Sequence, residues 1–141
     1  MIVVALACAA LVGATTVLHY EALRLLTYGL PRIGVPARAK LLVVMFATFV
    51  SHGLNIVLYG LAYWLLANGQ GFGHLVGGDA PRAAAYLYFS AETYTSLGFG
   101  DVVPVGPLRM LAGIETLNGL LLIGWSASYT YLAMERFWNE G

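Results

Sequence analysis

Three long apolar runs divide the chain, and each is long enough to cross a lipid bilayer, whose core takes about 20 helical residues. The runs cover Ile2 to Leu18, Leu41 to Ala67, and Arg109 to about Met134. We therefore predict an N-terminal membrane helix over residues 1–18, an outer helix over 41–67 and an inner helix over 109–134. This pattern predicts an all-α membrane protein.

The first run has small residues at a helical spacing. Ala5, Ala9 and Gly13 fall four residues apart, so they form a smooth face that would let this helix approach a neighbour closely. No positive residues follow Met1, as a cleaved signal peptide would require, so we expect the helix to be retained.

The linker between the first two runs, residues 19–40, is more polar and carries Arg24, Arg32, Arg38 and Lys40. We interpret residues 19–28 as a short amphipathic helix lying along the membrane surface. Basic residues favour the cytoplasmic side of a membrane, which predicts a cytoplasmic linker, an external N-terminus and a cytoplasmic C-terminus. A polybasic lipid-binding site is the alternative role for these charges.

A short glycine-containing stretch, residues 96–100, lies between an alanine-rich helix predicted over 83–95 and the third apolar run. Gly98 and Gly100 can take positive φ without a Cβ clash, so successive carbonyls can turn toward one axis and replace the water shell of an ion. The C-terminal end of the preceding helix carries partial negative charge, which favours a cation. The alternative is an ordinary glycine-rich turn. A second Gly-Phe-Gly, at 71–73, lacks these flanks and is interpreted as a flexible loop.

The residues around this stretch resemble the pore module of tetrameric potassium channels, whose filter is commonly written TVGYG followed by Asp. The segment Tyr88 to Thr93 resembles the pore helix of that family, and Asp101 resembles its flanking acid. The resemblance covers residues 41–138 and implies a homotetramer around a central pore. It also implies that potassium ions are bound by the filter residues Ser96, Leu97, Gly98, Phe99 and Gly100.

The resemblance further implies a set of residues that support the filter: Glu92, Asp101, Thr95 and Tyr88. Glu92 and Asp101 match the paired acids of the family, which implies two carboxylates sharing one proton behind the filter. The alternative is that Glu92 accepts hydrogen bonds from nearby backbone amides while Asp101 is solvated at the pore mouth.

In the third run, the register of the family implies a set of cavity and gate residues: Leu120, Ile123, Ala127, Tyr131, Gly119 and Glu115. Gly119 matches the hinge glycine of the inner helix, although Gly119 or Gly124 could equally serve close packing. Glu115 is an ionisable group inside an apolar helix, so we expect it to face protein rather than lipid.

The second run carries its polar side chains on one helical face: Thr48, His52, Asn55, Tyr59 and Tyr63. Facing lipid, they would leave donors and acceptors unpaired, so we expect this stripe to pack on the first helix or on the pore module. For His52, a structural hydrogen-bonded role and a pH-sensing role both stay open.

Composition independently favours a membrane protein, because 60% of residues are hydrophobic and 10% are charged, whereas soluble domains carry about 25% charged residues. The formal net charge of zero gives no sign of a nucleic-acid partner. The three histidines lie in different segments and the single cysteine has no pair, so we expect no enzyme and no cofactor. The expected partners are membrane lipid and the permeant potassium ion.

These observations together predict a potassium-selective channel that conducts passively across the plasma membrane. Leu97 and Phe99 depart from the family's valine and tyrosine, so a nonselective monovalent cation channel is an alternative. A non-conducting membrane scaffold is a second alternative.

Overall fold

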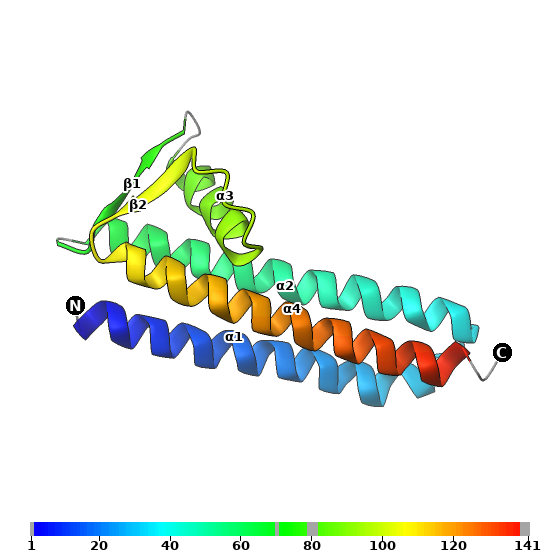
Figure 1. Cartoon of the computed structure of the whole chain (residues 1–141). Coiled ribbons are helices and arrows are strands. Elements are labelled where there is room, and N and C mark those ends of the chain that lie inside the picture. Colours follow the sequence, from blue (N-terminus) through cyan, green and yellow to red (C-terminus); the bar gives the residue numbers. More distant parts are fainter. Residues whose placement is uncertain (1, 70, 79–81, 139–141) are drawn as a thin grey trace.

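The computed structural model describes residues 2–69, 71–78 and 82–138. Its elements, in order, are α1 (Ile2–Gly29), a 3-10 turn (Leu30–Arg32), α2 (Ala37–Ala67), β1 (His74–Gly77), α3 (Arg82–Tyr94), β2 (Val102–Val105) and α4 (Leu108–Trp138). Figure 1 shows the three long helices α1, α2 and α4 side by side, with the short α3 and the two strands at one end. This arrangement places the filter stretch, which joins α3 to β2, at the end of the molecule that also holds the N-terminus.

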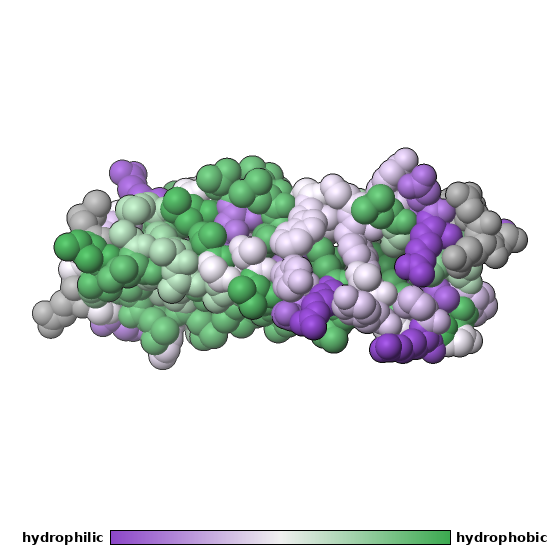
Figure 2. All heavy atoms as spheres, turned by 90° about the horizontal axis from the view of Figure 1, so that it is seen from below, coloured by the Kyte–Doolittle hydropathy of each residue, from purple (hydrophilic) through white to green (hydrophobic). Residues whose placement is uncertain are grey.

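The three long helices are each long and apolar enough to span a membrane: Ile2–Arg32, Ala37–Ala67 and Leu108–Phe137. Seen from the α1 side, hydrophobic residues cover most of the left part of the surface, and hydrophilic residues gather toward the right end (Figure 2). The chain is therefore an all-α membrane protein, as predicted, with a small two-stranded sheet added.

α1 does not end at Leu18 but continues in one piece to Gly29, so the separate surface helix predicted over residues 19–28 is wrong. The inward-facing positions continue through this region at helical spacing: Val4, Cys8, Thr15, His19, Leu23 and Leu26. Glu21 and Arg24 pair with each other at 3.1 Å on the outer face. The amphipathic pattern thus comes from packing on α2 and α4, not from lying on a membrane surface.

The smooth face of Ala5, Ala9 and Gly13 does not pack against another helix of the same chain. All three residues are exposed, and no atom would lie within 4 Å of a Cβ added at Gly13. α1 instead packs through the face that holds Val4 and Cys8, so within the single chain the small residues do not make the predicted close approach.

The glycine-rich segment after α2 contains β1, which pairs antiparallel with β2 from His74 opposite Val105 to Gly77 opposite Val102. A Cβ added at Gly73 would lie 1.9 Å from the Val105 carbonyl oxygen, so Gly73 lets the two backbones approach. The Gly-Phe-Gly interpreted as a flexible loop therefore ends against β2. The sequence also predicts a cap for α3 at Asp79 or Ala80, with Pro81 in its first turn, but these three residues lie outside the described ones.

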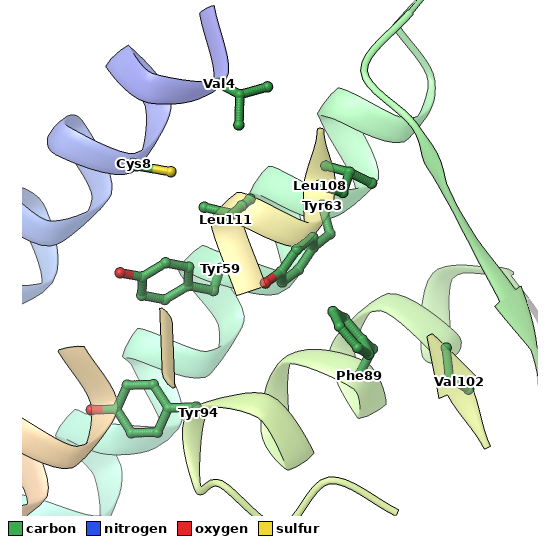
Figure 3. Packing of buried hydrophobic residues seen from close by; sticks show 9 residues of the cluster. All are labelled: Val4, Cys8, Tyr59, Tyr63, Phe89, Tyr94, Val102, Leu108 and Leu111. Carbon is green, nitrogen blue, oxygen red and sulfur yellow. The ribbon is translucent and has the colours of Figure 1, made fainter. Parts of the chain in front are cut away.

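The core at the filter end joins all four helices. Figure 3 shows its buried side chains converging from α1, α2, α3, β2 and α4: Val4, Cys8, Tyr59, Tyr63, Phe89, Tyr94, Val102, Leu108 and Leu111. The rings of Tyr63 and Phe89 meet edge to face with centroids 5.0 Å apart. Because these residues are buried, α3 is held in one position against α2 and α4.

Candidate ion filter

The filter backbone has positive φ at every second residue: 60° at Ser96, 56° at Gly98 and 77° at Gly100. Left-handed residues that alternate along a chain turn alternate peptide planes over, so successive carbonyls point to the same side. The positive φ values expected at Gly98 and Gly100 are confirmed. Ser96 also has a positive φ, although residues other than glycine rarely do.

Four consecutive backbone amides of the filter donate hydrogen bonds back to the end of α3. The amide of Ser96 donates to the Thr93 carbonyl at 3.1 Å, and the amides of residues 97 and 98 donate to the Glu92 carbonyl at 2.8 and 3.3 Å. The amide of Phe99 donates to the Glu92 carboxylate at 3.2 Å. The C-terminal end of α3 therefore fixes one side of the filter backbone.

The carbonyls of residues 96–99 accept no hydrogen bond from any donor among residues 2–69, 71–78 and 82–138. The side chains of this stretch are exposed in the single chain, Leu97 by 57% and Phe99 by 67%. A row of unpaired carbonyls can replace the water shell of a cation when several such rows face one another.

The two acids beside the filter have separate partners. Asp101 accepts hydrogen bonds from the Tyr88 hydroxyl at 3.0 and 3.2 Å and from the Val102 amide at 3.1 Å. Glu92 accepts from the Phe99 amide, and no hydrogen bond joins the Glu92 and Asp101 carboxyls, both of which are described. The resemblance implied that the Glu92 and Asp101 carboxyls pair directly, and the structure corrects this. Glu92 instead contacts a backbone amide, which is the alternative given in the sequence analysis.

The pKa of Glu92 nevertheless depends on its surroundings and on Asp101. Burial raises the pKa of Glu92, the hydrogen bond from the Phe99 amide lowers it, and the charge of Asp101 raises it. Tyr88 and Thr95, the other predicted supports, form bonds at either side of the filter. Tyr88 donates to Asp101, and the Thr95 hydroxyl donates to the Ala91 carbonyl at 2.7 Å.

Glu115 is fully buried where α2, α3 and α4 meet. Its carboxyl oxygens lie 2.6 Å from the Tyr63 hydroxyl and 2.5 Å from the Ser90 hydroxyl. The Ser90 hydroxyl also lies 2.8 Å from the Ile56 carbonyl, yet its single proton can serve one acceptor only. A protonated Glu115 donating to Ser90, which then donates to Ile56, satisfies every group. Glu115 is thus buried against the pore helix α3 and does not line a cavity.

Gly119 lies where α4 passes closest to the end of α3. A Cβ added there would lie 2.2 Å from the Tyr94 carbonyl oxygen, whereas no atom would lie within 4 Å of one added at Gly124. The nearby Thr116 hydroxyl donates to the Thr93 carbonyl at 3.2 Å. Of the two roles weighed for Gly119, close packing is the one this contact supports.

A family model described as ion channel matches residues 51–136, more than half of the chain. The chain belongs to this ion-channel family. The resemblance to the pore module of potassium channels, which was drawn from the filter and its flanks, is thereby confirmed.

The channel is similar to two curated relatives. It is 33% identical over 96 residues to the inward rectifier potassium channel Kirbac3.1 of Paramagnetospirillum magnetotacticum, covering 65% of this chain and 30% of that protein. It is 34% identical over 80 residues to protein LctB of Geobacillus stearothermophilus, covering 50% of this chain and 58% of that protein. The chain thus spans less than two thirds of either relative. No solved structure matches the chain.

The remaining residues predicted to line the cavity share one exposed surface of α4. Leu120 is exposed by 51%, Ile123 by 37% and Tyr131 by 61%, and Ala127 is also exposed. Glu115 and Gly119, which were grouped with them, are buried. The exposed set is available to line a space that the single chain leaves open.

The polar stripe of α2 packs on protein, as expected. His52 and Asn55 lie 2.9 and 3.2 Å from the Tyr94 hydroxyl, and the Tyr59 hydroxyl accepts from Asn118 at 3.1 Å. Sequence reasoning missed Tyr94 and Asn118 as supports of the channel. Their signal was a polar group in the last turn of the pore helix and an amide inside an apolar helix, each of which needs a buried partner.

Proposed function

We propose that the protein is a potassium-selective channel that conducts K⁺ passively through four copies of the filter. The observation that carries this proposal is the alternation of positive φ at Ser96, Gly98 and Gly100, together with carbonyls at residues 96–99 that have no partner among the described residues. Backbone carbonyls held in this way replace the hydration shell of potassium.

A homotetramer follows because one row of carbonyls cannot surround an ion. Four copies would bring four rows together and cover the exposed Leu97 and Phe99 side chains. The exposed α4 residues Leu120, Ile123 and Tyr131 would line a largely apolar cavity below the filter, which can close by dewetting. Family membership supports this assembly and supports a role in transport rather than catalysis. No cofactor is proposed beyond the permeant ion.

The name of the relative Kirbac3.1, an inward rectifier potassium channel, supports potassium as the ion. Phe99 lacks the hydroxyl of the family's tyrosine, so one hydrogen bond that would brace the filter cannot form. The contact of Tyr88 with Asp101 supplies a brace at the filter's outer end instead. This local compensation supports retained selectivity in spite of the departures.

For the membrane, we propose the plasma membrane with the N-terminus outside. The N-terminal end of α1 lies at the same end as α3 and the strands (Figure 1). The basic residues Arg32, Arg38 and Lys40 follow α1 and begin α2, at the opposite end. Since basic residues favour the cytoplasmic side, the filter would face outward.

The test is ion flux and reversal potential with the purified full chain in liposomes, together with native mass spectrometry in detergent. We expect tetramers, and a reversal potential that follows the potassium gradient and ignores sodium. Gly98→Ala should abolish flux because Gly98 has a φ of 56°, which alanine rarely adopts. Gly13→Ala is the matched control. As at Gly98, an added Cβ meets no atom within 4 Å, but Gly13 lies in the helix α1, whose backbone conformation alanine adopts readily.

Three results would contradict the proposal. Equal permeability to sodium and potassium would identify a nonselective cation channel. Absence of flux from well-folded protein would identify a scaffold. Monomers or dimers as the sole species would remove the basis for a shared central filter.

A further inference from the structure

A buried chain of hydrogen-bonded side chains crosses all four helices next to the filter. Its members are joined at 2.9 Å in each step, and we call them the histidine chain: Ser51, His19, Ser126, His52 and Tyr94. His19 comes from α1, Ser51 and His52 from α2, Tyr94 from α3 and Ser126 from α4. The N-terminal helix is therefore connected, bond by bond, to the last residue of the pore helix.

The geometry of each group in the histidine chain is specific. Both nitrogens of His19 are bonded, Nδ1 to Ser51 and Nε2 to Ser126, and both nitrogens of His52 are bonded, Nδ1 to Tyr94 and Nε2 to Ser126. The two imidazole rings lie 4.8 Å apart. His19 and Tyr94 are fully buried, and Ser126 is 8% exposed.

When both imidazoles are neutral, each has one donor and one acceptor, so the chain has a direction. Asn55 donates to the Tyr94 hydroxyl at 3.2 Å, which leaves Tyr94 free to donate to His52. His52 then donates to Ser126, Ser126 donates to His19, and His19 donates to Ser51. This order satisfies both nitrogens of both rings.

One added proton changes the bond at the pore-helix end, whichever ring receives it. A doubly protonated His52 donates at both nitrogens and can no longer accept from Tyr94. A doubly protonated His19 donates to Ser126, which turns its own proton to His52, and His52 must then present a donor to Tyr94. In either case the Tyr94 hydroxyl loses its acceptor on His52.

Tyr94 passes this change to the filter. Its carbonyl lies against Gly119 of α4, and its neighbours Glu92 and Thr93 hold the amides of the filter through their carbonyls. We propose that the histidine chain couples α1 to the filter, with His19 as a positioning residue, and that protonation of its imidazoles lowers conduction. This proposal rests on the proposed channel function.

Other titratable groups near the histidine chain do not replace it. Glu115 of α4 contributes to the raised pKa of Tyr94. Its carboxyl, however, is already hydrogen-bonded to Tyr63 and Ser90. On α1, Glu21 is paired with Arg24 at the surface. Burial raises the pKa of Tyr94 to about 12, so its hydroxyl keeps its proton at physiological pH.

The first test is potassium flux in liposomes from about pH 8 to about pH 4, a range that includes and extends below the one in which free histidine changes charge. Flux should fall about fivefold on acidification, the change in an equilibrium that loss of one net hydrogen bond produces. Tyr94→Phe removes the hydroxyl and keeps both imidazoles, so its flux should no longer depend on pH. His74→Gln, on the exposed β1 strand, is the matched control and should keep the parent profile.

The second test separates α1 from the rest of the chain. Ser126→Ala breaks the link between the imidazoles, so adding His19→Gln to Ser126→Ala should leave the pH profile unchanged, whereas His19→Gln alone should alter it. The same comparison in thermal stability needs no conduction. If the parent conducts at no pH, the proposed function fails, while the stability comparison still decides the coupling.

The coupling would be refuted if Tyr94→Phe kept the parent pH profile. It would also be refuted if His19→Gln had the same effect on flux and stability with and without Ser126. Where Tyr94→Phe fails to assemble, the pair of His19→Gln and Ser126→Ala decides the question.

Discussion

Gly119→Ala should destabilise the channel, because α4 has no room for a methyl group where it passes the pore helix. The added Cβ would lie 2.2 Å from the Tyr94 carbonyl oxygen and 3.0 Å from its carbonyl carbon. Ordinary contacts begin at 3.4 Å, so the two helices would have to separate by about 1.2 Å, the difference between 3.4 and 2.2 Å. Both atoms belong to backbone and cannot turn aside as a side chain could.

The magnitude follows from two opposing effects. Replacing glycine by alanine inside a helix stabilises it by about 1 kcal/mol, whereas overpacking a tight contact costs about 1–3 kcal/mol. Gly124→Ala carries the first effect alone, because no atom lies within 4 Å of its added Cβ. The difference between the two variants therefore isolates the clash at about 1–3 kcal/mol, or roughly 3–9 °C in Tm.

The assay is thermal unfolding of both purified variants in the same detergent, followed by potassium flux in liposomes. Gly119→Ala should melt below Gly124→Ala and conduct less, because moving Tyr94 shifts the residues that hold the filter amides. If Gly119 acted as a hinge alone, both alanines would stiffen α4 and raise Tm alike. Equal Tm values for the two variants would refute the packing argument.

Two further predictions concern the carboxyls near the filter. Tyr63→Phe should lower Tm because it removes the 2.6 Å donor of the buried Glu115, at a cost of about 1–3 kcal/mol for the unsatisfied oxygen; an unchanged Tm would contradict this role. Burial raises the pKa of Glu92 above its ordinary value of 4.5, so its contribution to stability is complete below that value and is lost as pH rises through the raised pKa. Glu92→Gln keeps an acceptor for the Phe99 amide, and its Tm measured against pH should lose this dependence; a curve identical to the parent's would contradict the assignment.

The sequence by itself determined the features that depend on local chemistry. Hydrophobic runs of sufficient length identify membrane helices whatever they pack against. The bounds predicted for the outer and inner helices therefore lie within a few residues of those of α2 and α4. Glycines one residue apart permit positive φ regardless of the rest of the fold, so the backbone geometry at Gly98 and Gly100 was also predicted. Polar side chains inside an apolar helix must find partners, which placed the stripe of α2 against protein.

The identity of those partners was decided by the tertiary structure alone. Periodicity states that a residue faces inward but not which residue it meets, so the contact of His19 with Ser126, 107 positions away, has no signal in the sequence. The same holds for Asp101, which meets Tyr88 rather than Glu92, and for Gly119, whose neighbour is a backbone carbonyl of another helix.

α1 shows most directly why local patterns were insufficient. Its second half carries Glu21 and Arg24 outward and Leu23 and Leu26 inward, a pattern shared by surface helices on membranes and by helices packed on protein. The choice between them depends on whether another apolar face is available. α2 and α4 supply that face, and burial against them continues the helix to Gly29.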